Sequence, residues 1–217
     1  MNWIDINNTF VTVLGYPLSY VEFIGTVTGF FSVWLAAKSN VLTWPIGLIN
    51  VFCFFCIFYQ VRLYSDMFLQ VYFFVISIYG WIAWKNQDRK KGTPIKTISE
   101  KQRIMVAIII LLVTLSMGTF VKNIHTLIPA IFISPASYPY IDTFVAVLSV
   151  IATVLLARRK IENWILWIIV DIISVVLYAK KHVLFISIEY GIFMCLATLG
   201  LLTWLKLLRN EKRIGHR

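Results

Sequence analysis

Apolar stretches long enough to cross a lipid bilayer recur along the whole chain, separated by short polar breaks. A helix of about 18 or more apolar residues spans the hydrocarbon core of a membrane. On this pattern we expect seven membrane-spanning helices, at residues 18–37, 41–60, 63–84, 104–121, 139–157, 162–180 and 183–207. The sequence therefore predicts an all-α membrane protein with seven transmembrane helices.

The polar segments between these helices divide the chain into two groups of three helices with a single helix between them. Residues 1–17 mix polar and apolar side chains, which is typical of a segment lying in the membrane interface. Residues 85–103 contain Gly92 and Pro94 among charged side chains and read as a solvated linker. The predicted order is an N-terminal interfacial segment at 1–17, a first three-helix repeat at 18–84, a linker at 85–103, a connecting transmembrane helix at 104–121, an outer loop at 122–138, a second three-helix repeat at 139–207 and a basic tail at 208–217.

The two groups of three helices match one another when the chain is shifted by 120 residues without a gap. Because apolar helices match easily, the comparison depends on the rarer residue types, which pair as Trp44 with Trp164, Gly80 with Gly200, Trp84 with Trp204 and Glu22 with Asp142. With three helices in each repeat and one helix between them, both repeats face the same way across the membrane. Parallel repeats of this kind place a substrate near the midplane, between the halves.

Composition agrees with this assignment. Hydrophobic residues make up 59% of the 217 residues and charged residues only 14%, too few to cover the surface of a soluble protein of this length. The mean hydropathy of +0.80 also lies in the range of membrane proteins. Eight Trp and ten Tyr suit a chain whose helix ends meet the membrane interface.

The basic residues give the orientation of the chain. A net charge of +10 in a soluble protein would suggest nucleic-acid binding, but loops on the cytoplasmic side of membrane proteins are enriched in Lys and Arg. With the N-terminus outside, sixteen Lys and Arg side chains fall on the inner side and four on the outer side. The outer four are Arg62, Lys122, Lys180 and Lys181. We therefore expect an N-out/C-in topology and no nucleic-acid partner.

Asp171 is the sharpest candidate for chemistry. It lies near the middle of an otherwise apolar helix, where a carboxylate costs about 2.5–3.5 kcal/mol on insertion scales. One interpretation is a counter-ion for a cationic substrate, flanked by Trp164 and Trp167 for cation–π contact. The alternative is a carboxylate that is kept neutral or hydrogen-bonded between helices.

Further polar and aromatic side chains fall in the same helices. Asn50 and Gln70 can each donate and accept hydrogen bonds, which suits recognition of an amide or of sugar hydroxyls, although bonding between helices explains them equally well. Tyr190 stands at the position that the 120-residue shift pairs with Gln70. No nucleotide-binding loop, catalytic serine motif or zinc-protease motif occurs in the sequence, so we expect no enzyme activity, cofactor or metal.

Four motifs stand out along the chain, namely Trp44-Pro-Ile-Gly-Leu-Ile-Asn50, Leu63-Tyr-Ser-Asp-Met-Phe-Leu-Gln70, Tyr79-Gly-Trp-Ile-Ala-Trp84 and Asn163-Trp-Ile-Leu-Trp167 with Asp171 four residues later. Together they resemble the PnuC family of nicotinamide riboside transporters. The resemblance spans roughly residues 20 to 207. It implies a substrate-binding signature made of Trp44, Asn50, Gln70, Asn163, Trp164, Trp167, Asp171 and Tyr190.

The resemblance also implies a fold, an assembly and a mode of transport. The fold would be a 3+1+3 arrangement similar to SWEET sugar transporters, in a homotrimer with one pathway per subunit in the bacterial inner membrane. Transport would be facilitated diffusion of nicotinamide riboside, which a cytoplasmic kinase then phosphorylates and so retains. One departure concerns proline-based hinges, because Pro45 of the first repeat corresponds to Ile165 in the second.

Three functional hypotheses follow from the residues and the resemblance. The first is a transporter of nicotinamide riboside, whose pyridinium cation, amide and ribose match a carboxylate, indoles and carboxamides. The second keeps the fold and changes the cargo to a related cationic vitamin such as thiamine. The third is a membrane scaffold without a pathway, in which the intramembrane polar residues pair with one another.

Overall fold

The computed structural model of the chain describes residues 3–13, 15–62, 64–89, 95–127, 137–180 and 184–214. Two short strands, β1 (Thr9–Val13) and β2 (Tyr16–Ser19), form an antiparallel hairpin. Seven helices follow: α1 (Tyr20–Ala37), α2 (Thr43–Gln60), α3 (Tyr64–Arg89), α4 (Glu100–Leu127), α5 (Pro139–Ala157), α6 (Glu162–Lys180) and α7 (Leu184–Ile214). All seven are long and apolar enough to span a membrane, which confirms the prediction of a multi-pass, all-α protein.

The helices extend beyond the apolar stretches that predict them. α3 continues to Arg89, α4 begins at Glu100 and α7 continues to Ile214, so both ends of the predicted 85–103 linker are helical. The physical reason is that Lys, Arg, Glu and Gln are good helix formers. Hydropathy marks the residues at which a helix leaves the hydrocarbon core, but the helical backbone continues into the polar residues that follow.

The N-terminal residues and the hairpin are attached to the start of α1 and to the end of α2. Ser19 and Glu22 form a capping box at the start of α1. The Gln60 side chain at the end of α2 accepts a hydrogen bond from the Ile6 N–H at 3.1 Å and donates one to the Ile4 carbonyl at 2.8 Å. The position of residues 1–17 in the membrane interface stays a prediction.

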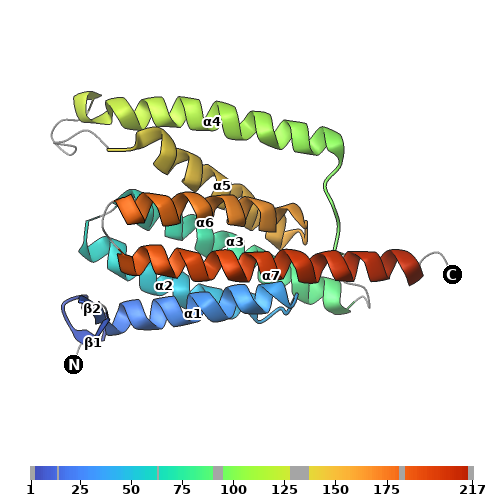
Figure 1. Cartoon of the computed structure of the whole chain (residues 1–217), viewed down its shortest axis with the longest axis horizontal. Helices are drawn as coiled ribbons and strands as arrows, with labels where there is room; N and C mark the ends of the chain where they lie inside the picture. Colours follow the sequence, from blue (N-terminus) through green and yellow to red (C-terminus); the bar gives the residue numbers. More distant parts are fainter. Residues whose placement is uncertain are drawn as a thin grey trace.

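Six of the seven helices form a ring (Figure 1). Within it α1 packs on α2, α2 on α3, α3 on α5, α5 on α6, α6 on α7, and α7 back on α1. α4 lies outside this ring at one edge of the molecule and packs chiefly on α5. The helices α1–α3 therefore form one half of the ring and α5–α7 the other, and α4 connects the two halves.

The turn after α1 and the turn after α5 have the same conformation. Ser39 and Arg159 both adopt a left-handed backbone, with φ of 54° and 52°. In each turn this residue donates its N–H to the carbonyl three residues earlier, Ser39 to Ala36 at 2.8 Å and Arg159 to Leu156 at 2.9 Å. Both turns lie at the end of the ring that α3 and the C-terminus also approach, on the right in Figure 1. We call this end of the ring the basic end, because its two turns carry Lys38 and residues 158–160, which are all Lys or Arg.

Candidate functional site

Four tryptophans form a row across the ring near its basic end. The ring centroids of Trp44 and Trp84 lie 5.4 Å apart at 89°, those of Trp84 and Trp204 lie 6.2 Å apart at 44°, and those of Trp204 and Trp164 lie 5.6 Å apart at 87°. All four side chains are at most 3% exposed. The row therefore crosses from one half of the ring to the other, with nearly equal edge-to-face contacts at its two ends.

The two inner tryptophans of this row join the halves through hydrogen bonds. Trp84 of α3 donates its indole N–H to the carbonyl of Ala157 at the end of α5, at 3.1 Å. Trp204 of α7 donates its indole N–H to the carbonyl of Ala36 at the end of α1, also at 3.1 Å. These bonds are reciprocal, because each half supplies one donor and one acceptor.

The two outer tryptophans pack on glycines. A Cβ atom at Gly80 would overlap the ring of Trp44, and one at Gly200 would lie 2.7 Å from three atoms of Trp164. Only glycine leaves space for the indole at these positions. The pairs Trp44–Gly80 and Trp164–Gly200 thus fix the outer rings against their own halves.

Among the described residues, the buried polar atoms that lack a hydrogen-bond partner include three that belong to predicted substrate-binding side chains at the row. They are the indole N–H groups of Trp44 and Trp164 and the side-chain oxygen of Asn163. Asn163 is fully buried, and its amide donates to the Lys160 carbonyl at 2.6 Å. Buried polar groups are nearly always bonded, so two donors and one acceptor remain available to a polar ligand.

Asp171 lies in the middle of α6 and is only 3% exposed in the isolated chain. Its side chain therefore points into the protein and not into lipid. Within the described part of the chain, no Lys or Arg lies within ion-pairing distance of it. Trp164 and Trp167 precede it by seven and four residues, which places them about 10 Å and 6 Å away along the helix axis.

A layer of aromatic side chains continues beyond Asp171. Tyr190 of α7 lies near Ser174 and Asp171 of α6. Its ring stacks on Tyr178 with centroids 5.5 Å apart and planes at 11°. Phe193, one turn further along α7, contacts Phe30 of α1 with centroids 4.7 Å apart, so this layer also joins the two halves.

The remaining candidates are placed differently from one another. Asn50 of α2 donates to the Gly25 carbonyl of α1 at 2.8 Å, which is a bond between helices. Gln70 of α3 is partly buried, and no hydrogen bond joins it to another described residue. Trp167 is partly buried against the tryptophan row. The structure thus brings Trp44, Asn163, Trp164 and Trp167 together at the row. It brings Asp171 and Tyr190 together further from the basic end.

Sequence reasoning assigned no role to some residues that build this region. Trp84 and Trp204 are the donors that join the halves, and their 120-residue spacing together with that of Gly80 and Gly200 was the available signal. Arg159 is 1% exposed, pairs with Asp88 at 2.8 Å and lies 4.3 Å from the Trp84 ring centre. Its burial gives no signal in the sequence, because a loop arginine normally faces water.

The side chains gathered here are suited to the recognition of a polar aromatic ligand. Among the described residues, no group of three His, Cys, Asp or Glu side chains is placed to hold a metal ion. A carboxylate, indole rings with free N–H groups and an amide oxygen can bind a cationic aromatic ring that carries polar substituents.

Comparison with known proteins identifies the family. The sequence matches the profile of the nicotinamide mononucleotide transporter family over residues 19–206. It is 31% identical over 233 residues to the nicotinamide riboside transporter PnuC of Escherichia coli K12, with 97% of each chain covered. The chain belongs to the PnuC family of membrane transporters. This confirms the resemblance found in the sequence motifs, and the family is one of transporters and not of enzymes.

Another relative and a solved structure extend the comparison. The riboflavin/roseoflavin transporter RibM of Streptomyces davaonensis is 23% identical, with 98% of this chain and 96% of the relative covered. The crystal structure of the vitamin B3 transporter PnuC matches with a TM-score of 0.68 at 22% identity, covering 88% of this chain and 83% of that one. The fold of the PnuC family is therefore that of this chain.

Proposed function

We propose that this protein carries nicotinamide riboside across the bacterial inner membrane by facilitated diffusion. The observation that supports this most strongly is Asp171, a buried carboxylate with no described Lys or Arg partner in the middle of a spanning helix. A carboxylate in the membrane is costly, and one that is present therefore usually serves a function. The pyridinium cation of the riboside supplies the missing positive charge, and indole faces near it add cation–π attraction.

The charges of the described residues favour the riboside over the other cargoes named for relatives. A mononucleotide carries a phosphate, which proteins bind with Arg or Lys side chains. Among the described residues Arg159 is the buried basic side chain, and Asp88 already neutralises it. Riboflavin has no permanent positive charge and gives Asp171 no ionic partner. A riboside with a cationic ring and no phosphate fits both observations.

The polar substituents of the riboside match the atoms that lack a partner. Its carboxamide can accept hydrogen bonds from an indole N–H and donate to the Asn163 oxygen, and its ribose hydroxyls can do either. Trp44 and Trp164 offer donors from opposite halves of the ring. A ligand between the halves would therefore contact both, as expected for a site that opens to alternate sides.

We assign two parallel three-helix repeats and an N-out/C-in orientation to this transporter. The equivalent turns at Ser39 and Arg159 and the reciprocal bonds of Trp84 and Trp204 support the repeats. The excess of Lys and Arg at the basic end supports placing that end in the cytoplasm. A homotrimer with one pathway per subunit, and retention of the cargo by a cytoplasmic riboside kinase, complete the proposal and rest on the resemblance to the family.

Binding titrations of the purified protein test the cargo. Nicotinamide riboside should bind, whereas nicotinamide mononucleotide and riboflavin should bind at least about a hundredfold more weakly, because each loses or opposes the ionic contact. Thiamine is the sharpest competitor, since it is also cationic and aromatic. Tighter binding of thiamine than of the riboside would replace the proposed cargo, and tighter binding of the mononucleotide would contradict the charge argument.

A further inference from the structure

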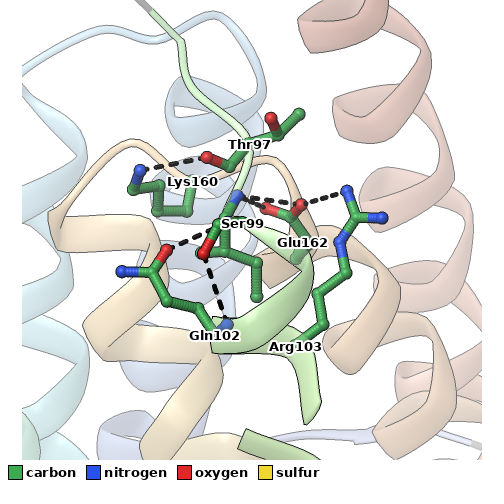
Figure 2. Close-up of polar contacts among 7 residues, drawn as sticks. Thr97, Ser99, Gln102, Arg103, Lys160 and Glu162 are labelled. Carbon is green, nitrogen blue, oxygen red and sulfur yellow. Dashed lines mark hydrogen bonds and ion pairs between the residues drawn. The ribbon is translucent and has the colours of Figure 1, made fainter. Parts of the chain in front are cut away.

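The residues just before α4 cross the basic end of the ring as a short extended strap, Ile95–Ser99 (Figure 2). The strap pairs with the turn between α5 and α6. The Lys96 N–H donates to the Arg159 carbonyl at 3.0 Å, and the Ile161 N–H donates to the Lys96 carbonyl at 3.0 Å. Lys160 adds a side-chain bond to the Thr97 carbonyl at 3.1 Å.

Glu162, in the first turn of α6, holds the other end of the strap. Both of its carboxylate oxygens accept a hydrogen bond from the Ile98 N–H at 3.1 Å. One of them also pairs with Arg103 of α4 at 3.1 Å (Figure 2). The Glu162 residue is 9% exposed, and hydrogen bonds to an ionised, shielded acceptor are stronger than those between neutral groups. Glu162 is therefore the main anchor of the strap.

The strap places an apolar side chain across the seam between the two halves of the ring. Ile95 is 2% exposed and belongs to the same cluster as Ala36 and Trp44 of the first half and Ala157 and Trp164 of the second. The strap therefore contributes a buried side chain to the apolar cluster that contains the tryptophan row.

The first half has no matching device among its described residues. The 120-residue shift pairs Glu162 with Leu42, whose side chain is apolar and 52% exposed. The N–H of Leu42 bonds to Asn40 of its own turn at 2.9 Å. A carboxylate anchor is thus present on one side of the seam, next to the segment that leads into α4.

We infer that the strap is the inner gate of the transport pathway, latched by Glu162 and sealed by Ile95. Cargo leaves toward the basic end when the strap separates from the α5–α6 turn and withdraws Ile95 from the seam. This inference rests on the proposed function, because a gate needs a pathway. Ile95 and Glu162 act on the opening of the pathway and do not touch the cargo.

A reversible cross-link tests whether the strap moves. Lys96 and Lys160 are direct partners in the pairing, so cysteines at both positions can form a disulfide in a background with Cys53, Cys56 and Cys195 replaced by Ala. In proteoliposomes, oxidation of the Lys96→Cys/Lys160→Cys protein should lower riboside uptake by at least about tenfold, and a reductant should restore it. Riboside binding to the oxidised protein should stay within about twofold. Normal uptake by fully cross-linked protein would overturn the gate, and each single-cysteine variant serves as the oxidation control.

A second measurement needs no cargo and so separates the gate from the proposed function. A cysteine at Ile95 in the same background should react slowly with a water-soluble thiol reagent, because the site is 2% exposed. Glu162→Gln should accelerate that reaction by about tenfold through loss of the charged acceptor. Glu100→Gln, which removes an exposed carboxylate at the start of α4, should leave the rate unchanged. Equal rates in the Glu162→Gln and parent proteins would overturn the latch, whether or not the riboside binds.

Discussion

Replacing Asp171 by Asn isolates the ionic part of cargo recognition. The substitution keeps the shape of a side chain that is 3% exposed and removes only its charge. A hydrogen-bonded or ionic contact to a charged group is worth about 1.5–3 kcal/mol. The Kd for nicotinamide riboside should therefore rise by about ten- to hundredfold, since about 1.4 kcal/mol corresponds to a factor of ten.

The same substitution should act in the opposite direction on stability. A carboxylate in the hydrocarbon region costs about 2.5–3.5 kcal/mol, and no described basic residue offsets that cost here. The Asp171→Asn protein should thus unfold at the same temperature as the parent or at a higher one. A thermal melt in detergent checks this result and shows that weaker binding does not come from misfolding.

A neutral analogue makes the test decisive. Reduced nicotinamide riboside keeps the amide and the ribose and lacks the positive charge, so Asp171→Asn should change its Kd by less than about twofold. Calorimetric titration of both ligands against both proteins measures the coupling between the carboxylate and the ring charge. Glu100→Gln, which removes an exposed carboxylate at the start of α4, is the control. An equal loss of affinity for the charged and the neutral ligand would refute the counter-ion role.

Three further predictions follow from the packing of the ring and its hairpin. Gly200→Ala should lower the stability by about 1–3 kcal/mol, because its Cβ would lie 2.7 Å from Trp164. Gly191→Ala, which has open space around it, should leave the stability unchanged, and equal melting temperatures of the two variants would contradict this reasoning. Trp204→Phe should cost about 1–3 kcal/mol more than Trp164→Phe, because the two substitutions remove the same volume and only Trp204 also loses an indole hydrogen bond that joins the halves. Trp164→Phe should weaken riboside binding, and melts and titrations of the two variants measure both effects. Burial and the bond to Glu22 raise the pKa of Tyr16 above its ordinary value of 10.0, so its neutral form adds stability that is present below about pH 10 and lost as the pH rises further. Between pH 8 and 11 the melting temperature should therefore fall more steeply for the parent than for Tyr16→Phe. Parallel curves for the two proteins would refute the role of Tyr16.

The number and order of the helices could be predicted from the sequence because membrane crossing is a matter of length and apolarity. The seven apolar stretches correspond to seven helices, and the motifs around Trp44 and Trp164 led to the correct family. The ends of α3, α4 and α7 could not be placed in the same way, since charged residues outside the bilayer extend a helix without changing the hydropathy pattern.

The candidate site was predictable in its residue types and less so in its contacts. Asp171 stood out because a lone carboxylate is rare in an apolar helix, and its burial agrees with the interpretation that it faces the protein. Asn50 looked equally suited to a ligand and to a neighbouring helix, and its bond to Gly25 could be found only in three dimensions. The strap could not be predicted for a different reason, because Ile95 lies in a segment that looks like an ordinary solvated linker, and Glu162, which holds the strap, is distant from it in sequence at the start of a predicted helix.

The position of α4 outside the ring has a consequence for how the chain could be rebuilt. A triplet of helices ends on the opposite face of the bilayer from where it starts, so a second triplet joined directly to the first would be inserted upside down. In the proposed parallel arrangement, α4 restores the starting face while packing chiefly on α5. An unrelated apolar span fused between Arg103 and the start of α5 should therefore restore the direction of the second triplet, provided that it keeps the glycine on which Tyr140 packs.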